Sequence, residues 1–214
     1  CGTAMHAGLS GKSAIEELCR IPVTVDIASE FRYRNPIIDK NTLCIFISQS
    51  GETADTIAAL KLAKSKGSTA LAISNVIGSS ITREADYCIY THAGPEIAVA
   101  STKAYTSQVV LLDILAIYFA EILGTTPEIQ LKNIKNEILA LPSKIEETLK
   151  CAAPIKSFAK KIYQEKDIFF LGRGVDYTTA LEGSLKLKEI SYIHSDAYAA
   201  GELKHGPIAL IENG

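Results

Sequence analysis

Short apolar runs alternate with longer amphipathic segments along the first 124 residues of this 214-residue chain. Parallel strands need a crossover long enough to hold a helix, so this alternation predicts a parallel sheet covered by helices. The expected fold class is α/β, with a doubly wound parallel sheet. The strand-like runs are 22–27, 43–48, 69–74 and 87–90, and the helix-like segments are 52–66 and 98–124.

A change in the pattern of charged and apolar residues divides the chain into three parts. Between 127 and 166, charged residues are interleaved with apolar residues at helical spacing, and Pro142 and Pro154 interrupt the pattern. We expect a first unit at 1–126, a helical connector at 127–166 and the start of a second unit at 167–214.

A weak internal repeat supports two related units. The start of the chain, with Cys1-Gly2-Thr3 before a helix and Ala28-Ser29-Glu30 after it, recurs at an offset of 170 to 172 residues. The second copy contains Leu171-Gly172-Arg173 before a helix at 177–192. The first copy lacks the strand that should precede Gly2, and the second stops before its later strands. We therefore expect one near-complete unit and the first part of another, cut from a longer polypeptide.

Charge and hydropathy exclude several classes of partner. Lys and Arg number 22 against 24 Asp and Glu, so no nucleic-acid surface is indicated. The apolar stretch 109–118 is too short to span a bilayer and contains Asp113, and no basic-then-apolar leader opens the chain. These observations predict a cytoplasmic protein that binds neither nucleic acid nor membrane.

Cysteine and histidine do not form a pattern typical of a metal centre. The five cysteines are scattered without a C-x-x-C pair, and we expect them to be reduced residues of the core. The four histidines have no partner at a ligand spacing. We expect neither a metal nor a cofactor.

A polar hexapeptide, SQSGET at 48–53, joins an apolar strand to a helix. The first turn of a helix presents free N–H groups and the positive end of the helix dipole, which together favour an anion. Ser48, Gln49, Ser50 and Thr53 add polar side chains, and Gly51 allows close approach of the backbone. The segment predicts a phosphate monoester site. The alternative is that Ser50 or Thr53 only caps the helix.

Three charged residues share one face of the later helix. Glu182, Lys186 and Glu189 lie at positions i, i+4 and i+7. Surface ion pairing would explain them, whereas a carboxylate beside a bound sugar phosphate would act as a general base. Two further candidates are Ser101, which can cap the long helix or face a ligand, and His205, which lies in a glycine-bracketed polar segment.

Several motifs together resemble one family, the isomerase part of the glucosamine-6-phosphate synthases, also called glutamine–fructose-6-phosphate aminotransferases (isomerizing). The resemblance covers essentially the whole chain and implies two subdomains of the sugar isomerase (SIS) type, with a flavodoxin-like three-layer arrangement. The motifs are CGT at 1–3, SQSGET at 48–53, GPEIAVASTKAYT at 94–106, LEGSLKLKEISYIH at 181–194 and AYAAGELKHGP at 197–207.

The resemblance implies a site and a reaction. Fructose 6-phosphate would be aminated and isomerised to glucosamine 6-phosphate, with Glu189 moving the proton between C1 and C2. Lys186 and Glu182 would lie beside Glu189, and His205 would assist ring opening from the neighbouring subunit of a homodimer. The residues implied to contact the substrate are Ser48, Gln49, Ser50 and Thr53 at the phosphate, and Thr3, Val99 and Ser101 at the sugar.

The chain departs from the family pattern at several points. Ala4 stands where the family often has a phosphate-binding serine. The Schiff-base lysine and the glutaminase domain of the family lie outside the sequence, so this segment alone is expected to be inactive. Cys1 resembles the N-terminal nucleophile of the family's glutaminase domain. The residues that follow Cys1 resemble the sugar domain instead. Two alternatives stay open: a phosphosugar isomerase or deaminase without glutaminase, and a non-catalytic sugar-phosphate sensor.

Overall fold

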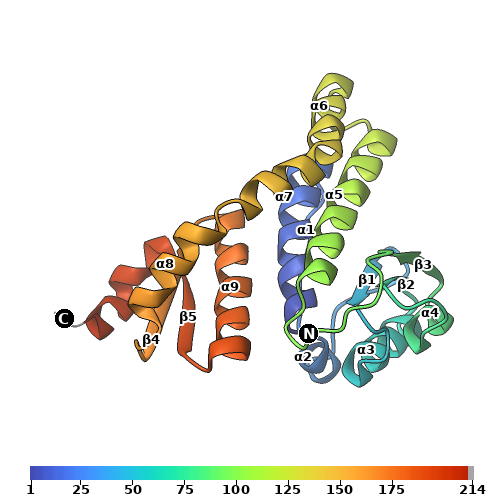
Figure 1. Cartoon of the computed structure of the whole chain (residues 1–214). Coiled ribbons are helices and arrows are strands. Elements are labelled where there is room, and N and C mark those ends of the chain that lie inside the picture. The colour runs from blue at the N-terminus through green and yellow to red at the C-terminus, as the bar shows by residue number, and fades with distance from the viewer. Residues whose placement is uncertain (212–214) are drawn as a thin grey trace.

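The computed structural model describes residues 1–211 and contains two parallel sheets (Figure 1). The first has the order β1-β2-β3, formed by Leu43–Ser48, Thr69–Ser74 and Tyr87–Tyr90. The second pairs β4, Asp167–Gly172, with β5, His194–Ala199. In register, Leu43 lies beside Thr69 and Asp167 beside His194. The predicted α/β class with parallel sheets is confirmed.

Helices surround both sheets. In the described part of the chain they are α1 (Thr3–Cys19), α2 (Ala28–Tyr33), α3 (Ala54–Ser65), α4 (Ser80–Glu84), α5 (Lys103–Leu123), α6 (Glu128–Leu139), α7 (Leu141–Leu149), α8 (Ala152–Ile162) and α9 (Val175–Ser191), with two short 3₁₀ helices, η1 (Ala200–His205) and η2 (Pro207–Leu210).

The predicted strands at 43–48, 69–74 and 87–90 are confirmed with the same bounds. The predicted strand at 22–27 is wrong, because this segment has no ladder partner within residues 1–211. A mostly apolar cavity of 870 Å³ is lined by residues 21–26 and by β1, among others. A strand needs a hydrogen-bonded neighbour about 4.8 Å away, and residues 22–27 have none within residues 1–211.

Two other predictions about elements need correction. The long helix begins at Lys103 instead of 98, and residues 98–100 and 102 form bends before it. The strand β5 was not predicted, since His194-Ser195-Asp196 has little of the apolar, β-branched character that marks a strand.

The internal repeat is visible in the structure. Each bound of α9 and η1 lies 172 residues after the matching bound of α1 and α2. The residue before α1 is Gly2, with φ 54° and ψ −134°, and its counterpart before α9 is Gly174, with φ 58° and ψ −127°. Both glycines adopt a positive φ that a side chain would strain, so the same turn leads into both helices.

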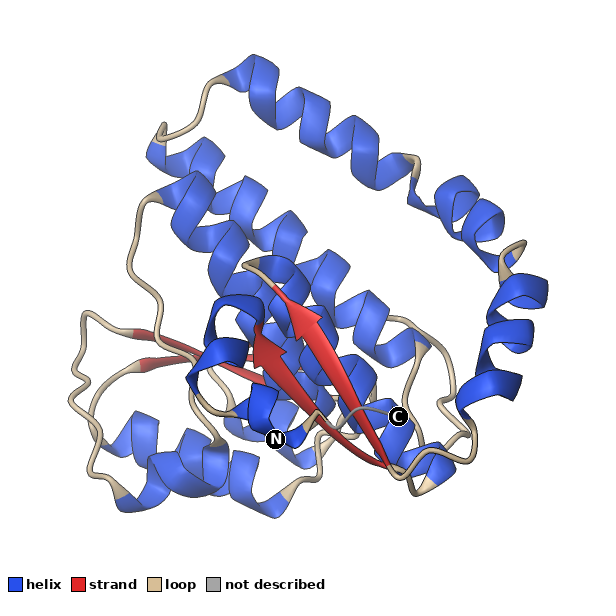
Figure 2. Cartoon of the chain, turned by 90° about the vertical axis from the view of Figure 1, so that its left-hand side faces the viewer, coloured by secondary structure: helices blue, strands red, loops and turns tan. Residues whose placement is uncertain are grey.

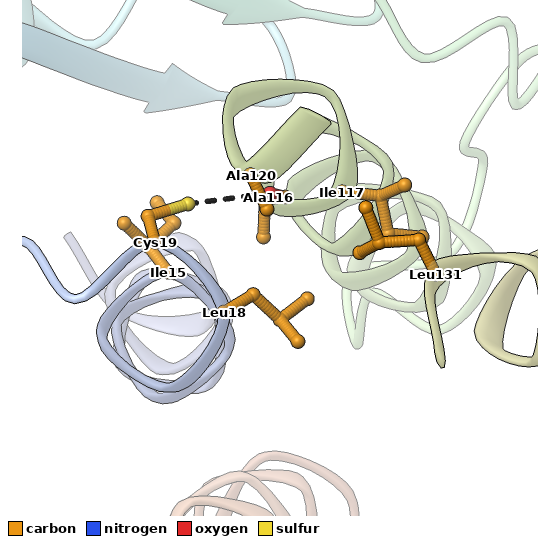
Figure 3. Packing of buried hydrophobic residues seen from close by; sticks show 7 residues of the cluster. All are labelled: Ile15, Leu18, Cys19, Ala116, Ile117, Ala120 and Leu131. Carbon is orange, nitrogen blue, oxygen red and sulfur yellow. Dashed lines mark hydrogen bonds between the residues drawn. The ribbon is translucent and has the colours of Figure 1, made fainter. Parts of the chain in front are cut away.

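The helices α1 and α5 share a hydrophobic core. Ile15, Leu18 and Cys19 of α1 pack against Ala116 and Ala120 of α5, together with Ile117 and Leu131 (Figure 3). The Cys19 thiol donates a hydrogen bond to the Ala116 carbonyl at 3.3 Å. Burial raises the pKa of this thiol.

The other cysteines are not all core residues. Cys1, Cys88 and Cys151 are exposed, and Cys44 is half-buried, so the expectation of core positions holds only for Cys19 and partly for Cys44.

One described helix, α5, is long and apolar enough to cross a membrane by length and composition alone. The expectation that the apolar stretches are too short was wrong, because it considered 109–118 instead of the full 21-residue helix. Ala116 and Ala120 of α5 are fully buried against α1, while Leu112 packs against Ile73 of β2. A core helix of a sheet-based domain has this packing.

The helices α6, α7 and α8 follow one another as an arm between the two sheets (Figures 1 and 2). Leu131 is the one buried residue of α6, and neither α7 nor α8 has a buried residue. Contact between the two sheet-containing units is made by α1 and α9, which pack against each other. The position of α9 therefore depends on the α1–α9 contact more than on the arm.

Candidate functional site

The SQSGET segment forms a tight polar loop between β1 and α3. The Gly51 N–H donates to Ser48 Oγ at 3.1 Å, and the Glu52 N–H donates to Ser50 Oγ at 3.2 Å. The Gln49 carbonyl accepts from the Asn75 N–H at 3.1 Å, which ties the loop to the end of β2. These bonds fix the conformation of the loop.

Gly51 is required by this conformation. Its φ is 67°, and a Cβ at this position would lie 2.1 Å from Ser79 Oγ and 2.9 Å from Ser74 Oγ. A side chain would be strained by the positive φ and would collide with two buried serines. Glycine therefore lets the loop pack closely on the segment that follows β2.

A cavity of 210 Å³ opens at this loop. Four residues predicted to hold phosphate line it, and so do Thr3 and Ser101, which the family resemblance assigned to the sugar. Ala4 also lines the cavity, so the missing serine hydroxyl would have been part of it. The lining residues are Cys1, Thr3, Ala4, Ile47, Ser48, Gln49, Ser50, Thr53, Thr56, Ser101 and Gln108.

The start of α3 faces this cavity without a side-chain cap. Thr53 is the N-cap residue and makes no capping hydrogen bond, and the Ser50 oxygen accepts from Glu52 instead. The alternative that Ser50 or Thr53 only caps the helix is therefore not supported. Thr53 and Thr56, at the first turn of α3, both line the cavity, which leaves the positive end of the helix dipole directed at it.

Three buried polar atoms in the described chain lack a hydrogen-bond partner: Thr56 Oγ1, Ser101 Oγ and Gln108 Oε1. All three residues line the same cavity. A buried polar atom without a partner costs about 1–3 kcal/mol, so a polar ligand or water in the cavity would relieve this cost.

Sequence reasoning missed Thr56 and Gln108. Gln108 is the polar member of a buried face of α5, with Ala104 and Leu112 one turn before and after it. Ala104, Gln108 and Leu112 are 1%, 2% and 2% exposed. A polar residue among apolar ones at i±4 was the signal that could have identified it.

The charged residues of α9 are anchored to α1. Glu182 is 5% exposed, and its Oε1 accepts from the Thr3 hydroxyl at 2.9 Å. Its other oxygen, Oε2, lies 2.6 Å from His6 Nδ1. The imidazole must donate to this carboxylate, which places a proton on Nδ1. The interpretation that these charged residues only form ion pairs on the surface is therefore wrong for Glu182.

Lys186 is the next charged residue on the same face of α9. Its Nζ lies 3.6 Å from Glu182 Oε1 and 2.5 Å from Glu189 Oε2. Thr3 both lines the cavity and bonds to Glu182, so polar contacts lead from the cavity through Thr3, Glu182 and Lys186 to Glu189. Burial, and secondarily the charge of Glu182, raises the pKa of Tyr105 on α5. The residues of α9 themselves do not line the cavity.

Two predicted site residues lie elsewhere. Val99 is 97% exposed and does not line the cavity, and His205 is exposed at the end of η1. Their roles stay predictions, as do the roles of the α9 residues. Within residues 1–211, no group of three or more His, Cys, Asp or Glu side chains could hold a metal ion.

Comparison with known protein families identifies the family of this chain. The sequence profile of the SIS domain matches residues 1–118 and 161–214. The chain belongs to the SIS domain family. The unmatched residues 119–160 include the end of α5, all of α6 and α7, and most of α8.

Within the SIS family, the chain is homologous to part of the glutamine–fructose-6-phosphate aminotransferases (isomerizing). It is 66% identical to that enzyme of Clostridium tetani and 60% identical to that of Clostridium acetobutylicum, over all 214 residues. The chain spans about a third of the length of these relatives, 35% in both cases.

A solved structure shares the fold. The C-terminal domain of glucosamine-fructose-6-phosphate aminotransferase from Francisella tularensis superposes with a TM-score of 0.96 at 42% identity. The match covers 99% of this SIS chain and 60% of that domain. The resemblance read from the motifs is therefore confirmed at the level of family and fold.

Proposed function

We propose that this SIS chain binds fructose 6-phosphate as part of a glutamine–fructose-6-phosphate aminotransferase (isomerizing). The observation that carries the proposal is the 210 Å³ cavity, which combines the uncapped start of α3 with three unpartnered buried polar atoms. Relatives that are 60% identical or more carry this enzyme's name. The predicted phosphate ligands converge at the cavity.

The chemistry would take place beside the cavity. The phosphate is held by Ser48, Gln49, Ser50 and Thr53, and Glu189 moves a proton between C1 and C2 of the sugar. Lys186 supports this role, because its ammonium holds the Glu189 carboxylate in place and connects it to Glu182. With ammonia released from glutamine replacing the carbonyl oxygen at C2, which leaves as water, the product would be glucosamine 6-phosphate.

The partners follow from the same proposal. The relatives are about three times as long as this chain, which leaves room for a glutaminase domain in the same polypeptide. A homodimer would bring the exposed His205 of one subunit to the site of the other.

Binding of fructose 6-phosphate to the 214-residue chain tests the proposal. Isothermal titration calorimetry should detect fructose 6-phosphate and not fructose, because the phosphate supplies the charge that the α3 terminus attracts. Thr53→Val removes a hydroxyl with little change of shape and should weaken binding about tenfold, as expected for a hydrogen bond to a charged group.

Thr179→Val is the matched control, since Thr179 is an exposed residue of α9 that does not line the cavity. Equal binding of fructose and fructose 6-phosphate would contradict the proposal. So would an equal loss in the Thr53 and Thr179 variants.

A further inference from the structure

Two buried residues line the cavity and have no part in the phosphate loop. Gln108 of α5 is 2% exposed and Thr56 of α3 is 4% exposed. Gln108 Oε1 and Thr56 Oγ1 have no hydrogen-bond partner within the described residues, although both residues line the cavity. Together they form what we call the floor of the cavity.

The floor and the loop can bind different kinds of ligand atom. The loop residues offer hydroxyl and amide donors, which match the oxygens of a phosphate. A phosphate dianion has no proton to donate, so a carbonyl oxygen such as Gln108 Oε1 would face it oxygen to oxygen. With the amide in this orientation, the unpartnered Oε1 of Gln108 accepts from a different part of the ligand, one that carries an O–H group.

The size of the cavity agrees with a ligand larger than phosphate. Its 210 Å³ corresponds to about seven waters at roughly 30 Å³ each. A phosphate at the α3 terminus leaves space for carbon atoms and their hydroxyls next to α5.

We propose that Gln108 and Thr56 recognise a hydroxyl group on the carbon chain of the phosphosugar and so distinguish it from inorganic phosphate. This inference rests on the proposed function and extends it. Gln108 Oε1 accepts from the ligand hydroxyl, and Thr56 Oγ1 accepts from or donates to the same part of the ligand. A site built to bond a hydroxyl discriminates strongly against ligands that lack it, because its own buried polar groups are then left unpaired.

Replacement of Gln108 by a residue of similar shape tests this role. Gln108→Met keeps the length of the side chain and removes the amide. Calorimetry on the 214-residue chain should show fructose 6-phosphate binding weakened about tenfold and inorganic phosphate binding unchanged. Thr56→Val, nearly isosteric, should shift binding in the same direction and provides a second variant if Gln108→Met does not fold.

The matched control is Gln130→Met, on an exposed position of α6 far from the cavity lining. An equal loss for both ligands would show that Gln108 acts only through the fold and would overturn the inference. Unchanged binding of fructose 6-phosphate in both floor variants would also overturn it, since the floor would then hold only water. If the wild-type chain binds neither ligand, the proposed function itself fails.

Discussion

Glu189 is the α9 carboxylate with the geometry closest to that of a general base. It is partly exposed, with 30% of its side chain accessible, whereas Glu182 is buried and already bonded to Thr3 and His6. Glu189 has one close partner, Lys186. The Lys186 side chain can move away from the Glu189 carboxylate, or stay bound to it, as Glu189 gains or loses a proton. Of the two carboxylates, Glu189 is therefore the one to which we assign the proposed proton transfer.

In a complete enzyme containing this chain, Glu189→Gln should lower kcat by about 10² to 10⁴-fold and leave KM for fructose 6-phosphate nearly unchanged. The amide keeps the size of the side chain and cannot accept the proton. Formation of glucosamine 6-phosphate measures the loss. Glu165→Gln, at an exposed position before β4, is the control and should have normal turnover. A normal rate in Glu189→Gln would refute the proton transfer.

At this scale, the residues that could be predicted belong to local motifs. Ser48 to Thr53 are contiguous, so the same six letters that predict the loop also place four of its residues around one cavity. Gln108 and Thr56 could not be found in this way, because they come to the same cavity from two helices, α5 and α3, that are far apart in the sequence. His6 was missed for the same reason, since Glu182 lies 176 residues away from it.

At the scale of elements, α5 contains a titratable group in an apolar helix. Burial raises the pKa of Asp113 from 3.8 to about 6, and no ion pair offsets this in the described residues. The folded state therefore binds the proton more tightly than the unfolded state between about pH 4 and 6. The contribution of Asp113 to stability is largest below pH 4 and falls as the pH rises through 6.

Asp113→Asn removes this penalty and should raise the free energy of unfolding at pH 7.5 by about 1 kcal/mol, after allowance for partial exposure. At pH 4 the two proteins should be almost equally stable, because Asp113 is then protonated. Urea denaturation at both pH values measures the difference. An equal effect of the substitution at pH 4 and 7.5 would show that the carboxylate charge is not responsible.

Secondary-structure elements could be predicted where the chain pairs regularly in a sheet and one face is buried. The runs at 43–48, 69–74 and 87–90 are strands that share one parallel sheet, as their apolar patterns indicated. The run at 22–27 has the same kind of pattern, but strand formation needs a neighbour, and residues 1–211 place none beside it. Residues 98–102 carry a helical composition, yet the chain bends there before α5 begins at Lys103.

At the scale of the whole molecule, α9 is placed by its contact with α1, which includes a buried polar cluster. The arm of α6, α7 and α8 has one buried residue, Leu131, and α1 packs against α9. Within that contact, His6 and Thr3 hold the buried carboxylate of Glu182. The proposed reaction needs Glu189 near the substrate, so this contact joins binding in one unit to chemistry in the other.

His6→Leu should therefore separate the two units. It leaves the Glu182 carboxylate buried without its closest partner, and breaking a buried pair from one side costs about 3–5 kcal/mol. Because the arm is not packed against either sheet, the molecule can avoid this cost by moving α9 away from α1 and letting water reach Glu182. Hydrogen exchange should speed up in α9 and in the first turns of α1, and small-angle scattering should show a larger radius of gyration.

His6→Asn is the matched variant, because its side-chain amide can offer an N–H near the position of Nδ1. It should preserve the slow exchange of α9 and the compact radius, while His6→Leu loses both. The stability of β1, β2 and β3 should be similar in the two variants, since His6 belongs to neither the cluster around Leu60 nor the one around Ile73. If α9 exchanges equally slowly in both, packing of apolar residues holds the units together and the polar contact only fixes the orientation of Glu182.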